Sequence, residues 1–228
     1  MNLEGSKHRG KLELVIFDMD GLLIDSEQVA ARAQLKAAEI LELKFDLEDY
    51  RKLIGVNYHK GVEILSTHWD LPTVQRFLEI SETLENEIVE NEGIPVKNGV
   101  FELLSFLDEH EIPRVVATST ARRRAEDRLR TVGILPHIHG LTCGDEVAHA
   151  KPNPEIFLRS LGNTPAERAL IFEDSHNGLR AGIAAGIPVV YVPDMLEVPH
   201  DLLYEAVLPN LFEAIPYLTK REGLSLHL

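Results

Sequence analysis

The sequence is poor in cysteine, in basic residues and in long apolar runs, and each shortage excludes a class of protein. The single cysteine, Cys143, cannot close a disulfide within the chain, so we expect a reducing compartment, the cytoplasm. No apolar run approaches the ~18 residues that a membrane span requires. The first residues, Met1 to Lys11, are polar and unlike a secretory signal peptide.

The shortage of basic residues limits the possible partners. Against 37 acidic residues stand 23 lysines and arginines, which gives a net charge of -14. A chain this acidic repels phosphate backbones, so we expect no nucleic-acid partner, and the same surface charge favours a monomer. A small anionic substrate needs local positive charge or a metal ion. Glycine-rich loops of the dinucleotide-binding or Walker type are absent, so a nucleotide cofactor is not indicated.

Short apolar runs alternate with segments of helical spacing along most of the chain. The four clear runs cover residues 12–17, 114–118, 169–172 and 187–192, and weaker ones cover 140–142 and 206–208. Between them, spacings such as that of Val100, Leu103, Leu104 and Leu107 are typical of amphipathic helices. This alternation predicts an α/β fold, a doubly wound parallel sheet with helices on both faces.

One segment, residues 26–93, departs from this alternation. It has no clear strand, and its apolar residues have helical spacing in three stretches, from Val29 to Leu41, from Val62 to Trp69 and from Phe77 to Ile88. We therefore predict a helical domain at 26–93, inserted into a core of residues 1–25 and 94–228. The many glutamates from Glu79 to Glu92 are interpreted as a solvated helix face.

Two carboxylates follow the first predicted strand, two residues apart. Asp18 and Asp20 come where the chain leaves the strand, and Gly21 allows it to bend there. Ligands of open α/β sheets bind outside the carboxyl ends of the strands. Two close carboxylates repel each other unless a hard cation or a proton compensates. Taken alone, the pair is equally compatible with a turn that carries solvated aspartates.

Polar residues at the ends of other strands strengthen the functional interpretation. Thr118 and Ser119 end the second strand, where hydroxyl and N–H groups at a helix start either bind a phosphate-like anion or cap the helix. Lys151 precedes Pro152, which fixes the backbone beside an ammonium that could neutralise a phosphoryl group. Asp174 follows a further strand. The convergence of these groups on one sheet edge predicts phosphate chemistry.

In this order the motifs resemble those of the haloacid dehalogenase superfamily of phosphotransferases. The resemblance runs from about Leu12 to Val192 and rests on four segments: Asp18 to Glu27, Thr118-Ser119, Lys151 to Pro154 and Glu173 to Ser175. The insert has the position of the helical cap in the beta-phosphoglucomutase-like subgroup, which also contains sugar-phosphate phosphatases.

The resemblance implies a role for each catalytic candidate. Asp18 would attack phosphorus and form an aspartyl phosphate. Asp20 would protonate the leaving alcohol and later take a proton from water. The dehalogenase branch lacks an acid at this position, so dehalogenation is disfavoured. Magnesium would be held by the carboxylates of Asp18 and Asp174 and the backbone carbonyl of Asp20, supported by Glu173. The phosphoryl oxygens would be held by Thr118, Ser119 and Lys151.

The substrate side departs from the mutase pattern. Beta-phosphoglucomutases carry a cap arginine just after a Gly-Val pair. Here Gly55-Val56 is followed by Asn57, and Tyr58 takes the place of the arginine, while the cap histidine of the subgroup corresponds to Ala30. We take Tyr58, Arg122 and Asn177 as candidate substrate-binding residues. For Arg122 the interpretation as a solvated surface residue is favoured over substrate binding, and Asn177 is also interpretable as a helix cap.

The sequence therefore predicts a magnesium-dependent phosphatase acting on a small phosphorylated metabolite, with a sugar phosphate favoured. One alternative is a phosphosugar mutase that uses the same chemistry. A second is a catalytically silent protein that keeps the fold and only binds a ligand. The complete set of acids, hydroxyl and lysine weighs against the silent alternative.

Overall fold

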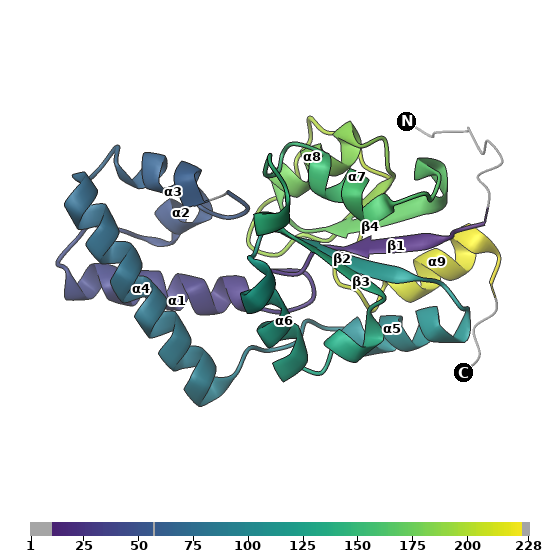
Figure 1. Ribbon diagram of the computed structural model, residues 1–228, viewed down its shortest axis with the longest axis horizontal. Coiled ribbons are helices and arrows are strands. Elements are labelled where there is room, and N and C mark those ends of the chain that lie inside the picture. Colours follow the sequence, from purple (N-terminus) through teal and green to yellow (C-terminus); the bar gives the residue numbers. More distant parts are fainter. Residues whose placement is uncertain (1–10, 57, 225–228) are drawn as a thin grey trace.

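The computed structural model describes residues 11–56 and 58–224, which form a parallel β-sheet with helices on both faces and a helical unit beside it (Figure 1). The sheet has the strand order β3-β2-β1-β4-β5-β6, and every pairing is parallel. Its strands are β1 (Leu14–Phe17), β2 (Arg114–Thr118), β3 (Gly140–Cys143), β4 (Ala169–Glu173), β5 (Val189–Tyr191) and β6 (Ala206–Val207).

The doubly wound parallel sheet expected from the alternating pattern is confirmed. Each predicted apolar run forms a strand, including the two weak ones, which become β3 and β6. β1 lies in the middle of the sheet, and all four of its residues are buried because helices cover both of its faces. This is why the run reads as continuously apolar rather than alternating.

The helices divide between the two faces of the sheet. On one side lie α5 (Val100–Glu109), α6 (Arg122–Thr131) and α9 (Ala214–Glu222), which pack on Val15 and Phe17. On the other side α7 (Glu155–Leu161) and α8 (His176–Ala184) pack on Leu14 and Ile16. Successive residues of β1 therefore point to opposite faces, as the pleat of a strand requires.

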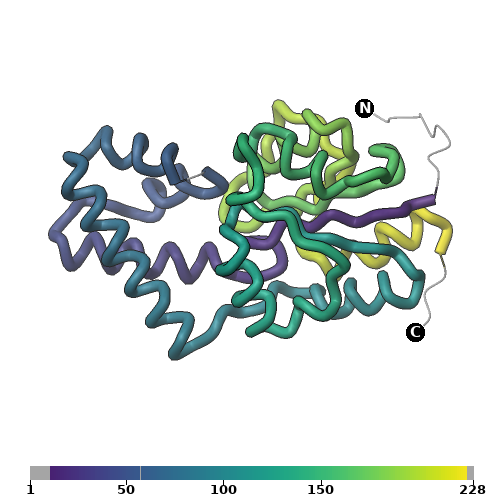
Figure 2. The backbone as a smooth tube through the Cα atoms, viewed as in Figure 1, coloured from purple at the N-terminus to yellow at the C-terminus, as the bar shows by residue number. Residues whose placement is uncertain are grey.

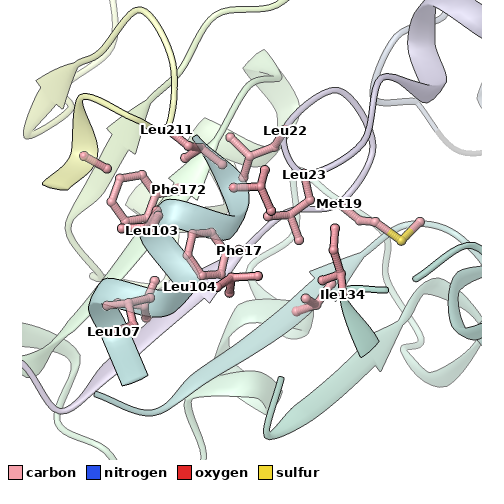
Figure 3. Packing of buried hydrophobic residues seen from close by; sticks show 14 of the residues in the cluster. Phe17, Met19, Leu22, Leu23, Leu103, Leu104, Leu107, Ile134, Phe172 and Leu211 are labelled. Atoms are coloured by element: carbon pink, nitrogen blue, oxygen red, sulfur yellow. The ribbon is translucent and has the colours of Figure 1, made fainter. Parts of the chain in front are cut away.

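The larger core holds the end of β1 in place (Figure 3). Phe17 stacks on Phe172 of β4 with ring centroids 5.4 Å apart, and Leu103 and Leu104 of α5 are buried in the same cluster. Burial of each such side chain contributes about 1.5–3 kcal/mol. The residue that follows Phe17, Asp18, thus leaves the sheet from a rigid, fully packed strand.

The helical unit contains α1 (Ser26–Ile40), α2 (Leu47–Arg51), α3 (Tyr58–Leu65) and α4 (Leu71–Glu92), with α1 and α4 side by side (Figures 1 and 2). The sequence pattern missed α2. This helix has only five residues, so it is too short to show an apolar period. It begins with a reciprocal capping box between Asp46 and Asp49. Within the described residues, no helix is both long and apolar enough to cross a membrane.

The helical unit, which we call the cap, has an apolar core of its own. Phe77 of α4 is fully buried there, and its ring lies 5.1 Å from that of Phe45 and 5.1 Å from that of Trp69. The chain enters and leaves the cap through two segments that pair with each other, Ile24 opposite Val96. The cap is therefore packed internally while it is tied to the sheet at a narrow base.

We expect Phe77→Ala to destabilise the cap by about 3–5 kcal/mol, because it opens a cavity in this small core. Trp69 is the only tryptophan of the chain, so its fluorescence during urea unfolding reports on the cap directly. The matched control is Phe101→Ala in α5, whose side chain is 43% exposed and whose loss should cost less than about 1 kcal/mol. Equal stability of the two variants would contradict this account.

Candidate active site

The site forms where β1, β2 and β4 end. In the parallel register Phe17 lies beside Val116 on one side and Phe172 on the other, so the residues that follow these strands emerge at one sheet edge. That edge gathers Asp18, Thr118 and Asp174, all of them buried. The polar residues at the ends of these three strands therefore lie together at one edge of the sheet, as the sequence predicted.

Lys151 forms the centre of this group. Its ammonium donates to Asp18 Oδ1 and, at 3.3 Å, to the carbonyl of Ala117, and it lies 4.7 Å from the ring centroid of Phe157. Burial raises the pKa of Asp18 to about 7, with Glu173 adding to the shift and Lys151 opposing it. Burial alone would lower the pKa of Lys151, but Asp18 and Glu173 outweigh it and raise that pKa. The lysine therefore stays charged.

A cluster of acids beside Lys151 fits a hard cation. One carboxylate oxygen each from Asp18, Glu173 and Asp174 lie within 4.8 Å of one another. Asp174 Oδ1 and Glu173 Oε2 are buried and have no hydrogen-bond donor in the described chain. Burial, and then the charges of Glu173 and Asp18, raise the pKa of Asp174 well above its usual range. Carboxylate oxygens suit a hard cation such as Mg²⁺, and its charge would offset the repulsion among these acids.

Gly21 allows the chain to pass close to this cluster. Its φ is +82°, and a Cβ atom there would lie 2.2 Å from Asp174 Oδ2. Both the left-handed backbone and the close approach require glycine. The bend that the sequence predicted at this residue is therefore what lets Asp174 reach the edge beside Asp18.

Asp20 is held by donors from three elements. It accepts hydrogen bonds from the hydroxyls of Ser26 (2.7 Å), Thr120 (2.7 Å) and Thr118 (3.1 Å). It also forms an ion pair with Arg128 (2.8 Å). Burial alone would raise the pKa of Asp20, but Arg128 and the hydroxyls outweigh it and lower that pKa. In this arrangement the ionised form of Asp20 is favoured.

The predicted site residues divide into two groups. Asp18, Asp20, Thr118, Ser119, Lys151, Asp174 and Tyr58 all line one cavity of about 400 Å³ between the sheet edge and the cap. Arg122 and Asn177 do not line it. Arg122 pairs with Glu146 at 2.8 Å, and Asn177 donates to the carbonyl of Gly55 at 3.0 Å, a bond between α8 and the cap. Their side chains are thus committed to structural contacts.

Sequence reasoning missed the arginines that do line the cavity, Arg124 and Arg128. They lie four residues apart on α6 and therefore share a face, whereas Arg122 points along another face toward Glu146. The spacing of four was the signal in the sequence. Glu85 of α4 also lines the cavity, and its place among many solvated glutamates concealed it.

The cap adds a further buried pair to the cavity. Glu27 accepts a hydrogen bond from the hydroxyl of Tyr50, and both residues line the cavity wall. Burial raises the pKa of Glu27 to about 7, against the hydrogen bond from Tyr50. These residues give the cap side a polar, hydrogen-bonding surface.

Comparison with known proteins relates this arrangement to characterised families. The sequence model of the haloacid dehalogenase-like hydrolases matches residues 15–192. A "Phosphorylated carbohydrates phosphatase" of Thermotoga maritima is 34% identical over 79% of this chain and 84% of its own length. A (DL)-glycerol-3-phosphatase of Arabidopsis thaliana is 29% identical over 91% of each chain. A crystal structure from Thermotoga maritima, described as a candidate beta-phosphoglucomutase, has a TM-score of 0.75 at 30% identity and covers 92% of this chain and 99% of its own.

The raised pKa values predict how stability depends on pH. Because the pKa of Asp18 rises from 3.8 to about 7 on folding, the folded chain keeps a proton that the unfolded chain releases, so stability falls as pH rises through that window. Glu27 and Asp174 have shifts of the same sign. The midpoint of thermal unfolding in chelator should therefore be lower at pH 8 than at pH 5.

Magnesium should counter this loss. A cation bound by deprotonated acids competes with protons, so we expect added magnesium to raise the unfolding midpoint more at pH 8 than at pH 5. Asp174→Asn should weaken this effect, whereas the surface variant Asp127→Asn should leave it unchanged. A magnesium effect of equal size at both pH values would contradict the assignment of the cluster.

Proposed function

The chain belongs to the haloacid dehalogenase-like hydrolases and is a phosphatase, and on that premise we propose that it hydrolyses a small sugar or polyol phosphate with magnesium, through a phosphate ester on Asp18. One observation carries the proposal. At a single sheet edge, Asp18 is paired with Lys151 beside the acids Glu173 and Asp174, and Asp20 lines the same cavity.

Asp18 is the nucleophile in this mechanism. Lys151 fixes one carboxylate oxygen, and the other attacks phosphorus while the bond from phosphorus to the leaving oxygen breaks. Lys151 and the groups at the end of β2, the Thr118 hydroxyl and the Ser119 N–H, hold the phosphoryl oxygens. Magnesium, when held by Asp18, Asp174 and the Asp20 carbonyl, offsets the negative charge of the phosphoryl group.

Asp20 handles the proton in both half-reactions. In the first it gives a proton to the leaving oxygen, which departs as an alcohol. In the second it takes a proton from the water that attacks phosphorus, and the bond to Asp18 breaks to release phosphate. The donors around Asp20 favour its ionised form, which is the form needed for the second step. Before it can donate in the first step, Asp20 must be protonated. The contacts with Thr118, Thr120 and Arg128 lower its pKa, so they must be exchanged for others in the substrate complex.

The names of the relatives and the cap side chains both favour a monophosphate substrate. The Thermotoga and Arabidopsis relatives are named phosphatases of phosphorylated carbohydrates and of glycerol 3-phosphate. The similarity to the candidate beta-phosphoglucomutase of Thermotoga maritima supports a phosphosugar mutase as a second candidate function. A mutase must hold a second phosphate, for which the mutase family uses a cap arginine. At that place this chain has Tyr58, which carries no positive charge and is 66% exposed. The nearby Lys60 pairs with Glu63 at 2.8 Å.

We expect Asp18→Asn to lower kcat by at least about a thousandfold, because the amide is no nucleophile. The fold should persist, since the change is nearly isosteric and removes a buried charge; circular dichroism and the unfolding midpoint check this. Asp127→Asn, an exposed change on α6, serves as the matched control and should keep wild-type kcat. A rate for Asp18→Asn within tenfold of wild type would show that another residue attacks phosphorus.

A second experiment separates hydrolysis from isomerisation. The protein and magnesium are incubated with beta-glucose 1-phosphate and catalytic glucose 1,6-bisphosphate, and glucose 6-phosphate and free phosphate are followed together. We expect phosphate release from sugar monophosphates without any need for the bisphosphate, because water accepts the phosphoryl group from Asp18. Efficient formation of glucose 6-phosphate with negligible phosphate release would establish the mutase instead.

A further inference from the structure

The cationic side chains of the cavity are already paired with carboxylates. Three cations line it, and five carboxylates line it with them. Lys151 is paired with Asp18, and Arg128 with Asp20 and Glu85. Arg124 is paired with Glu85 at 2.5 Å. A substrate that enters the cavity therefore meets cations whose charge the chain itself has neutralised.

Glu85 has an unusual position among these acids. It belongs to α4 of the cap, yet its Oε1 forms ion pairs with both Arg124 and Arg128 of α6 in the core, and Arg128 also donates a hydrogen bond to it. Its side chain is 13% exposed and that of Arg128 is 10% exposed. Two guanidinium groups converging on one oxygen form a strong anion site, because charge-assisted hydrogen bonds are the strongest that proteins make. The chain fills this anion site with its own carboxylate.

The position of Glu85 matters for the far end of a substrate. In the mechanism proposed above, the phosphoryl group of a substrate lies at Lys151 and the sheet edge, and its leaving group extends into the rest of the cavity toward the cap. A second anionic group near Arg124 and Arg128 must displace the Glu85 carboxylate or lie beside it, and like charges brought together out of water are costly. An uncharged leaving group meets no such penalty.

The neutral groups of the cap complete this argument. Gln34 of α1 lines the cavity, and its Oε1 is buried with no hydrogen-bond donor in the described chain. A sugar or polyol hydroxyl can donate to that oxygen. Burying an acceptor without a donor is unfavourable, so a hydroxyl-bearing leaving group gains a bond that the empty cavity lacks.

We propose that Glu85 is a specificity-determining residue: it occupies the anion site of Arg124 and Arg128, so that the enzyme accepts phosphomonoesters with uncharged, hydroxyl-bearing leaving groups and rejects those with a second anion. The proposal rests on the phosphatase function above and deepens it by naming the substrate class. Rejection comes from a repulsive group built into the site, a general way to obtain specificity.

Two pairs of substrates of nearly equal size test the proposal. Glycerol 3-phosphate and 3-phosphoglycerate differ by a hydroxymethyl group against a carboxylate, and glucose 6-phosphate and 6-phosphogluconate provide a larger pair. In each pair kcat/KM is measured for phosphate release with magnesium, and KM is supplemented by inhibition of p-nitrophenyl phosphate hydrolysis. For wild type we expect the uncharged member to be preferred by roughly tenfold or more.

Variants assign this preference to Glu85. Glu85→Gln frees the two arginines, so the preference ratio should fall by about tenfold or more, mainly through a lower KM and inhibition constant for the carboxylate-bearing member. Adding Arg124→Gln to Glu85→Gln should restore much of the ratio, because it removes a cation while the contact between cap and core stays broken. The control Glu82→Gln changes an exposed glutamate of the same helix and should leave the ratio unchanged.

The outcomes separate the two proposals. If wild type releases no phosphate from any ester in the presence of magnesium, the phosphatase mechanism fails. If it releases phosphate but does not discriminate within either pair, the role of Glu85 fails alone. The role also fails if Glu85→Gln lowers activity on both members equally, since that is the result of a merely structural contact between cap and core.

Discussion

The structure of the site depends on one buried ion pair, that of Lys151 with Asp18. Three buried acids, Asp18, Glu173 and Asp174, meet near the ends of β1 and β4, where little water can screen them, and their mutual repulsion would otherwise oppose the fold. Lys151 supplies fixed positive charge among them and reaches Asp18 and Glu173 at once. Its position follows from the packing of α7 against the sheet, because Phe157 of that helix lies under the ammonium.

A second ionic network joins the sheet edge to the cap. Arg128 contacts Asp20 on the core side and Glu85 on the cap side. A single guanidinium therefore connects the proposed general acid–base with helix α4 of the cap. Asn177 adds a neutral bond from α8 to the cap loop at Gly55. In the proposals made above, the charged residues of the cap select the substrate, while the acids of the sheet edge carry out the chemistry.

Features that depend on neighbouring residues could be predicted from the sequence, whereas features that depend on how distant elements pack could not. Strand positions were predictable because buried parallel strands leave continuous apolar runs, and the runs at 114–118 and 169–172 became β2 and β4. The helix α2 was not predictable, since five residues held by an Asp46–Asp49 capping box show no period. Arg122 was the residue chosen from its run of three arginines, yet Arg124 and Arg128 line the cavity, and only the rotation of α6 on the sheet distinguishes them.

The sequence by itself determined the fold class and indicated the sheet edge that holds the candidate site, because residues that follow parallel strands emerge together wherever those strands pair. Asp18, Thr118 and Asp174 could be placed in one site for that reason alone. The tertiary structure alone decided which side chains line the cavity and which of their charges are paired. The contact of Glu85 with Arg124 and Arg128 joins residues about forty positions apart on two helices, and no local pattern fixes how α4 of the cap is oriented toward α6 of the core.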